Sequence, residues 1–240
     1  GGSGLNYYTQ TTESPGTAVS LSSDGNIVAI GASSSWPGGE SPGGPGLIRV
    51  YKWDNVSWTK IGGDISGTDP QGFGHSVSLN SDGTVVGFGS ASYDAAGIVQ
   101  VYKWNNVNWV KRGLNINPEA TDDLAGASVS INAIGDIIAV GARLNNGAGS
   151  DAGHVRVYKW TNDISWIQQG LDIDGDSPNE QFGTSVSLNA AGNILAVGSP
   201  LYDGFLSKSG AIKVYKWNNV AWVKQFKTIE GLTAGESAGW

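Results

Sequence analysis

The chain is rich in glycine and poor in charge, which excludes several classes of protein. It has 240 residues with 37 glycines, no cysteine, 15% charged residues and a net charge of −7. Glycine at roughly twice its usual share of ~7% predicts many short turns. The missing cysteines exclude disulfide frameworks and thiolate zinc sites. The negative charge argues against nucleic acid as a partner, and no apolar run approaches the ~20 residues of a membrane span, so we expect no membrane insertion.

One sequence unit occurs four times along the chain. The motif Val-Tyr-Lys-Trp ends at four tryptophans that are 51 to 57 residues apart: Trp53, Trp104, Trp160 and Trp217. A second motif, Val-Ser followed by Leu or Ile, begins at four valines that keep step with them: Val19, Val77, Val129 and Val186. Because both motifs repeat together, the unit is a structural repeat.

Each unit reads as four strands. In the second unit, a strand over 76–79 is followed by a turn at 81–83 and a strand over 84–88. A third strand covers 98–104, and a fourth begins at Trp109. No window shows the apolar spacing of a helix.

Four antiparallel strands repeated about every 50 residues are typical of a β-propeller blade. We therefore predict an all-β fold, a β-propeller with four blades of four antiparallel strands. The repeat units cover about 15–73, 74–125, 126–182 and 183–240. Residues 1–14 read as a linker and an N-terminal segment, in which 5–12 is suited to pair with the last blade and close the ring.

A pair of tryptophans flanks the outer hairpin of every unit. In the second unit these are Trp104 and Trp109, with turn residues between them. We expect the two indoles to meet across the strands, an aromatic contact worth about 0.5 to 1.5 kcal/mol beyond burial. Because the pair recurs at the same strand positions, we interpret it as blade packing rather than as a sugar site.

The start of the unit resembles a known repeat. Phe73-Gly74 and Phe182-Gly183 precede the first strand, and Gly-Ala-Ser at 31–33 follows a second strand. This is similar to the FG-GAP repeat of integrin-alpha-type β-propellers, in a degenerate form. The resemblance implies a propeller used for adhesion or ligand binding.

The calcium loop of the integrin-type repeat is missing here. Its place between the first two strands holds a bare turn that contains Gly in all four units and Asp in only two, Asp24 and Asp82. We conclude that the position requires a turn geometry. Calcium in these hairpins is disfavoured, because it needs six or more oxygen ligands.

The long connections differ between units and are the expected binding surface, since loops on a rigid scaffold carry function. The candidate ligand-binding residues lie in three of these connections: Trp36, Tyr93, Asp94, Tyr202 and Asp203. The acidic run Asp172, Asp174 and Asp176 is the best cation candidate, although an EF-hand would require Glu where the chain has Gly183. We expect a solvated acidic loop and no cofactor, with calcium as the alternative.

Catalytic motifs are missing from the sequence. His75 and His154 occupy unrelated places in the unit, and we interpret both as packed or surface residues. We predict a non-catalytic, extracellular or cell-surface module for adhesion or ligand recognition, not an enzyme, with a protein or glycan ligand on the variable loops. The alternatives are a glycan-binding lectin, a structural spacer that contacts flanking repeats or itself, and, last, a glycosidase with paired carboxylates.

Overall fold

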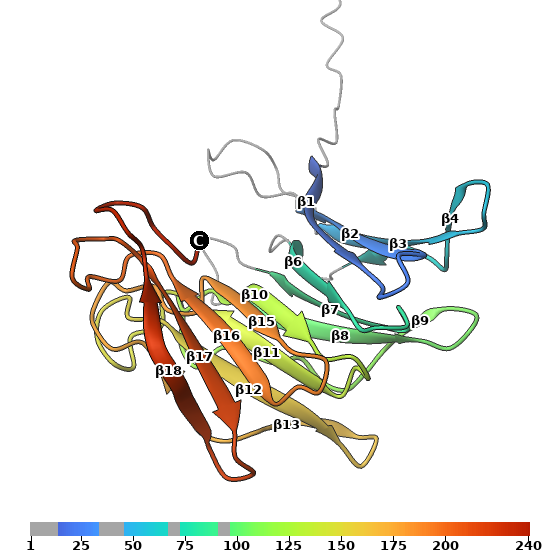
Figure 1. Cartoon of the computed structure of the whole chain (residues 1–240). Helices are drawn as coiled ribbons and strands as arrows, with labels where there is room; N and C mark the ends of the chain where they lie inside the picture. The colour runs from blue at the N-terminus through green and yellow to red at the C-terminus, as the bar shows by residue number, and fades with distance from the viewer. Residues whose placement is uncertain (1–13, 34–45, 67–72, 91–96) are drawn as a thin grey trace, which may run out of the picture.

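The computed structural model describes residues 14–33, 46–66, 73–90 and 97–240. They form four antiparallel sheets, which Figure 1 shows in chain order, one beside the next. The described residues contain no helix, and so none that could cross a membrane. The prediction of an all-β propeller with four blades of four antiparallel strands is confirmed.

Each sheet is one blade, and its four main strands pair in chain order. Blade 1 contains β1 (Ser14–Leu21), β2 (Ile27–Ser33), β3 (Leu47–Trp53), β4 (Trp58–Lys60) and the short β5 (Ile65–Ser66). Blade 2 contains β6 (Phe73–Leu79), β7 (Val85–Ser90), β8 (Ile98–Trp104) and β9 (Trp109–Lys111). Blade 3 contains β10 (Ala125–Ile131), β11 (Ile137–Ala142), β12 (His154–Thr161), β13 (Ser165–Gln168) and the short β14 (Ile173–Asp174). Blade 4 contains β15 (Ser185–Leu188), β16 (Ile194–Ser199), β17 (Ala211–Trp217) and β18 (Trp222–Glu230).

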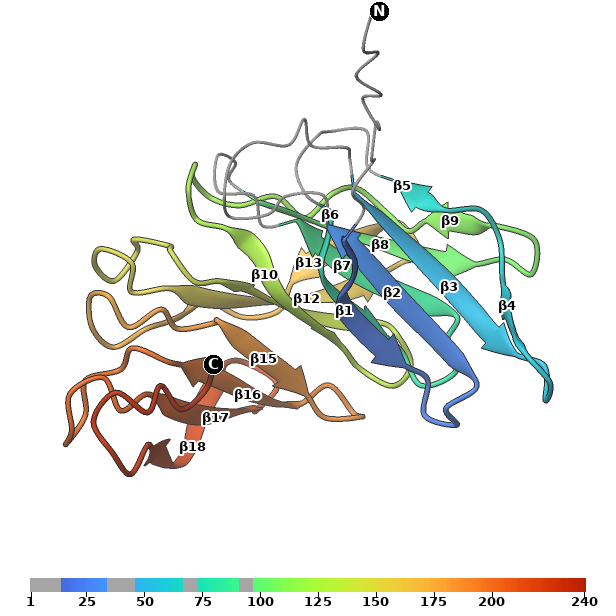
Figure 2. The same cartoon turned by 90° about the horizontal axis from the view of Figure 1, so that it is seen from above.

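The first strands of successive blades contact one another and form the inner edge of the row (Figure 2). In blade 2 the first strand begins earlier than predicted, at Phe73, and its register with β7 shifts between Phe73 and Ser76. The turn after this strand holds Gly83 at φ +69°. The matching glycines of the other blades also have positive φ, as the turn prediction requires: Gly25, Gly135 and Gly192.

Neighbouring blades meet backbone to backbone at paired glycines. A Cβ on Gly89 would lie 2.0 Å from the carbonyl oxygen of Gly126 in the next blade. The same close approach recurs at the other two blade interfaces, Gly31 to Gly74 and Gly141 to Gly183, and also between Gly198 of blade 4 and Gly239 in the segment after β18. Only glycine allows this separation, because any side chain would overlap the facing carbonyl group.

The hydrophobic core lies between the blades. Val99 and Val101 on β8 pack with Val129 and Ile131 on β10, and equivalent clusters fill the other two blade interfaces. Both faces of an inner blade are therefore buried. This explains why the strands carry apolar residues on both sides instead of alternating with polar ones.

The tryptophan pairs meet as predicted, with ring centroids 5.3 to 5.7 Å apart in all four blades. They also join neighbouring blades. The indole N–H of Trp109 donates to the carbonyl oxygen of Ile61 in blade 1 at 3.1 Å. Trp166 and Trp222 make the same hydrogen bond to the blade before them.

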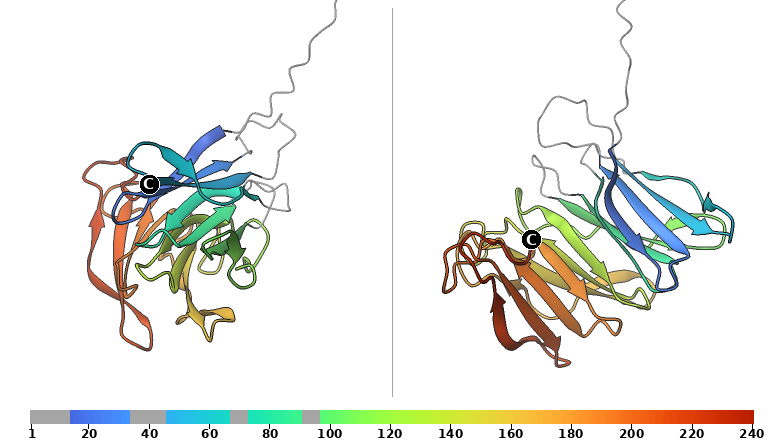
Figure 3. Two further views of the ribbon diagram at one scale, coloured as in Figure 1. Left: turned by 90° about the vertical axis from the view of Figure 1, so that its right-hand side faces the viewer. Right: turned by 45° about the horizontal axis from the view of Figure 1, so that its top comes forward.

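Blades 1 and 4 lie at the two ends of the row (Figure 3). On β1, Val19 and Leu21 are 66% and 58% exposed, whereas the matching Val77 and Leu79 of blade 2 are buried. The segment 5–12, predicted to close the ring, lies outside the described residues.

Replacing Gly113 with Ala is expected to lower the free energy of unfolding by about 1 to 3 kcal/mol, because of strain and overpacking. Gly113 has φ +84°, and a Cβ there would lie 2.7 Å from the ring of Trp160. Urea denaturation measures the change. Gly25→Ala is the control, since Gly25 also has positive φ but nothing lies within 4 Å of its Cβ position. Equal losses in the two variants would show that the contact with Trp160 does not matter.

Trp109→Phe removes the hydrogen bond to Ile61 and is expected to cost about 1 kcal/mol for that bond, in addition to lost packing. The matched control is Trp58→Phe in blade 1, whose indole N–H has no acceptor among the described residues. Thermal unfolding of the two variants should therefore show the larger drop for Trp109→Phe. The reverse order would contradict an interblade role for this hydrogen bond.

Candidate functional site

A long polar side chain stands at the same place on the third strand of every blade: Arg49, Gln100, Arg156 and Lys213. In blades 1 to 3 it bonds a side chain that follows the outer hairpin: Arg49 to Asp64, Gln100 to Asn115 and Arg156 to Asp172. The pair is thus a structural element of the blade. Departures from it mark places with an additional role.

Blade 3 keeps this pair but differs from the other blades at His154, two residues before Arg156. The other blades hold Leu47, Ile98 or Ala211 at this place. His154 begins β12 at the end of the blade where the long connections lie, and only 3% of it is exposed. Its Nδ1 has no hydrogen-bond partner among the described residues.

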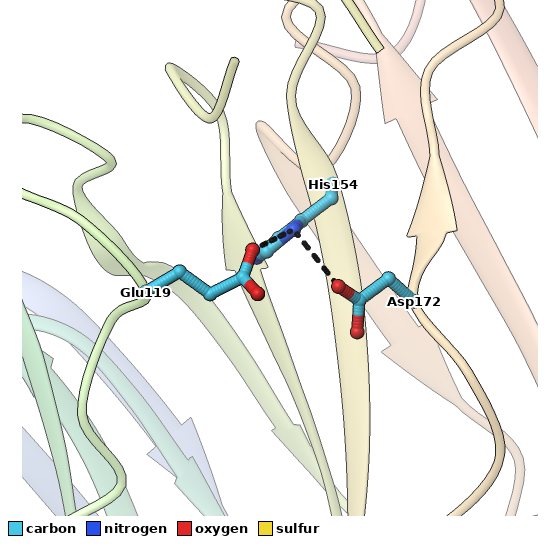
Figure 4. A group of neighbouring side chains, drawn as sticks. All are labelled: Glu119, His154 and Asp172. Atoms are coloured by element: carbon cyan, nitrogen blue, oxygen red, sulfur yellow. Dashed lines mark ion pairs between the residues drawn. The ribbon is translucent and has the colours of Figure 1, made fainter. Parts of the chain in front are cut away.

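Two carboxylates face this nitrogen (Figure 4). The Oε2 atom of Glu119, from the connection between β9 and β10, lies 3.7 Å from His154 Nδ1. The Oδ2 atom of Asp172, from the connection between β13 and β14, lies 3.9 Å from it. Glu119, His154 and Asp172 form the His154 group, whose donor atoms all lie within 4.8 Å of one another and are able to hold a metal ion.

Arg156 fixes the two carboxylates. Its Nε and Nη2 atoms donate to the two oxygens of Asp172 at 2.8 Å each, and it also pairs with Glu119. The buried Asn145 donates from Nδ2 to Glu119 Oε2 at 3.3 Å. The hydrogen bonds to Asp172 raise the pKa of Arg156, so this guanidinium stays charged.

The surroundings of the group are acidic. Burial, followed by the charge of Arg156, lowers the pKa of His154, so its imidazole is neutral near pH 7. Burial raises the pKa of Asp174, and the charges of Asp172 and Glu119 add to that effect. Asp123 is 1% exposed, and its Oδ1 lacks a partner within the described part of the chain.

The predicted acidic run divides between two places. Asp172 belongs to the His154 group, and Asp174, which pairs with His154 in the sheet, lies beside it. Asp176 instead bonds Lys213 of blade 4 at 2.8 Å. The three carboxylates therefore do not form one site.

The two predicted ligand-binding residues that the structure describes do not belong to the His154 group. Tyr202 lies over Lys213, with Nζ 4.8 Å from the ring centre. Asp203 accepts a hydrogen bond from the backbone N–H of Lys208 at 2.6 Å and so shapes its own loop. The remaining three lie outside the described residues: Trp36, Tyr93 and Asp94.

The sequence analysis missed His154 and Glu119 as site residues. His154 was expected to be a packed or surface residue. It is buried, and its Nδ1 has no hydrogen-bond partner among the described residues. Comparison with Leu47, Ile98 and Ala211 in the repeat is the signal that could have singled it out. Glu119 gives no such signal, because only the folded chain brings its connection against β12.

Lys213 in blade 4 is the fully satisfied counterpart of Arg156. It is completely buried and pairs with Glu180, which is also buried. Glu180 further accepts a hydrogen bond from Ser199 Oγ at 2.8 Å.

Lys213→Met is expected to lower the free energy of unfolding by about 3 to 5 kcal/mol, because it leaves the buried Glu180 without its counter-ion. Arg49→Met is the matched control at the same place in blade 1. Its partner Asp64 is partly exposed, so this change should cost less than about 1 kcal/mol. Chemical denaturation compares the two, and a cost for Lys213→Met as small as the control would contradict the assigned pairing.

No family model matches the sequence, and no curated protein matches it. Solved structures match its fold. The periplasmic gluconolactonase PpgL of Pseudomonas aeruginosa is 15% identical with a TM-score of 0.62, over 93% of this chain and 58% of that one. A Bacteroides fragilis protein with a provisional 6-phosphogluconolactonase name is 15% identical with a TM-score of 0.59, over 96% of this chain and 58% of that one. The RRP9 WD40 repeats are 10% identical with a TM-score of 0.53, over 89% of this chain and 52% of that one.

The chain therefore spans a little over half the length of these structures. At this identity the similarity establishes the fold, a β-propeller, and the narrower FG-GAP family is not confirmed. The predicted protein or glycan partner stays a prediction.

The functional prediction is wrong. The prediction was a non-catalytic adhesion or ligand-recognition module and not an enzyme, with a lectin, a spacer and, last, a glycosidase as alternatives. The matching structures include one named as a periplasmic gluconolactonase, next to WD40 repeats. The same architecture thus occurs in a protein named as an enzyme and in WD40 repeats, and variable loops on a repeated scaffold do not imply a binding role. What distinguishes the two is the chemistry of a site.

Proposed function

We propose that the chain is a hydrolase that opens a small lactone at the His154 group. The observation that carries the proposal is the buried Nδ1 of His154, which has no hydrogen-bond partner among the described residues and faces two carboxylates. An unsatisfied buried polar atom costs about 1 to 3 kcal/mol of stability. The other blades avoid this cost with an apolar residue at the same place, so the imidazole is retained for something other than folding.

The group contains what hydrolysis of an ester requires. Glu119 is partly exposed and offers a carboxylate to a water molecule, while Arg156 holds Glu119 and Asp172 in place. The water oxygen bonds the carbonyl carbon of the lactone, and the ring C–O bond breaks. Glu119 takes the proton that the water releases and passes it to the departing ring oxygen, which leaves a hydroxy acid. His154 Nδ1, which lies 3.7 Å from Glu119 Oε2, positions the water beside that carboxylate.

The comparisons support the substrate class. The fold matches a structure that is named as a gluconolactonase. This carries the substrate class from a similar fold to this chain by analogy.

Hydrolysis of δ-gluconolactone by the purified chain tests the proposal. Acid release, followed with a pH indicator, should exceed the uncatalysed rate, and His154→Leu should reduce the excess at least tenfold. Leu is the residue of blade 1 at this place, so the variant should fold. His75→Ala is the control and should keep the activity. A wild-type rate equal to the uncatalysed rate would overturn the proposal.

We also propose the FG-GAP family and an extracellular location as the finer assignments. The Phe-Gly pairs at the start of two units support the first. The word periplasmic in the name of the P. aeruginosa structure supports the second. Fractionation of producing cells tests the location.

A further inference from the structure

We infer that the His154 group binds a divalent transition-metal ion such as Zn²⁺ or Mn²⁺, with Glu119, His154 and Asp172 as ligands and Asp123 adding negative charge beside them. This metal site would belong to the proposed hydrolase. Only the catalytic role of the ion rests on that proposed function. Binding itself depends on the geometry of the site.

The chain contains its own comparison, because the connections that enter blades 3 and 4 are built alike. Each carries an acidic residue two positions before the pair that opens the next unit, Asp123 before Ala125-Gly126 and Glu180 before Phe182-Gly183. Each acidic side chain accepts a hydrogen bond from the backbone N–H of the residue three positions earlier. The donor is Ala120 for Asp123 and Ser177 for Glu180. The two carboxylates thus occupy matching places at successive blade interfaces.

At the interface of blades 3 and 4, a cation fills the space between the acidic groups. The ammonium of Lys213 contacts Glu180 and lies 2.8 Å from Asp176. Ser199 donates a further hydrogen bond to Glu180. Lys224 Nζ lies 3.9 Å from Asp176 Oδ2, so two cations face the two carboxylates of this connection.

At the interface of blades 2 and 3, the same compensation is missing. Ala142 stands at the place of Ser199 and has no hydroxyl to donate. Arg156 stands at the place of Lys213, but it bonds Asp172 and Glu119. Within the described ranges, the Oδ1 atom of Asp123 has no hydrogen-bond partner, and neither has Nδ1 of His154. A cation among these atoms would replace the charge that Lys213 supplies in blade 4.

The donor set selects the kind of ion. One imidazole nitrogen with carboxylate oxygens suits Zn²⁺ or Mn²⁺, whereas Ca²⁺ prefers oxygen ligands alone. Zn²⁺ binds nitrogen and oxygen ligands at about 2.0 to 2.2 Å, so the three donor atoms would have to move roughly 1 Å closer to one another. Glu119 is the ligand with room for that movement, because its side chain is 42% exposed, and its ion pair with Arg156 would have to adjust. A bound ion of this kind polarises an ester carbonyl and lowers the pKa of water that it binds.

Isothermal titration of the metal-stripped chain with ZnCl₂ and with MnCl₂, without substrate, tests the inference. We expect one ion per chain, and at least tenfold weaker binding in His154→Leu and in Glu119→Gln. The matched control, His75→Ala, removes the other histidine of the chain and should bind as the wild type does. Circular dichroism verifies that each variant is folded. Electron paramagnetic resonance of Mn²⁺ gives a second readout that does not depend on heat.

Two results would overturn the inference: no binding by the folded wild type, or equal binding by His154→Leu and the wild type. Lactone hydrolysis, measured separately with and without a chelator, keeps the two proposals apart. Metal binding without hydrolysis would support the ion and contradict the hydrolase. Hydrolysis that a chelator leaves unchanged would support the hydrolase and contradict a role for the ion.

Discussion

The architecture depends on the contact between glycine backbones of neighbouring blades. A Cβ at Gly89, or at its counterparts Gly31 and Gly141, would lie 2.0 to 2.2 Å from a carbonyl oxygen of the next blade. This separation sets how closely the sheets stack. The apolar side chains of β8 and β10 then fill the space between blades, and an indole N–H reaches the backbone of the blade before it. The high glycine content is therefore a packing requirement as much as a source of turns.

Because this constraint repeats, the four blades serve as controls for one another. A polar residue present in every blade, such as the one at Arg156, belongs to the scaffold. A residue present in one blade only, such as His154 where the other blades have Leu47, Ile98 and Ala211, is not required by the scaffold. The candidate site combines both kinds: the scaffold pair Arg156 and Asp172 fixes the geometry, and His154 and Glu119 add new chemistry. This explains how a regular fold acquires a local site without any change of architecture.

The connections that enter blades 3 and 4 differ by the length of one acidic side chain, Asp123 in the first and Glu180 in the second. Glu180 is long enough to reach Lys213 and Ser199, and it closes the interface of blades 3 and 4. Asp123 is shorter by one methylene, and Ala142 stands at the place of Ser199. Buried acidic groups need compensation, and Asp123 Oδ1 has no hydrogen-bond partner among the described residues.

The sequence by itself determined the four-bladed propeller, the hairpin turns and the meeting of the tryptophan pairs, because periodicity and turn residues are local properties that recur in each unit. It also placed Asp172 and Asp174 among the cation candidates, although it grouped them with Asp176. Only the tertiary structure decided that Asp176 pairs with Lys213 and that Glu119 lies beside His154. Each of these contacts joins residues from different units, and the connections involved share no sequence pattern. Loop residues find their partners through the stacking of the blades, and stacking is a property of the whole chain.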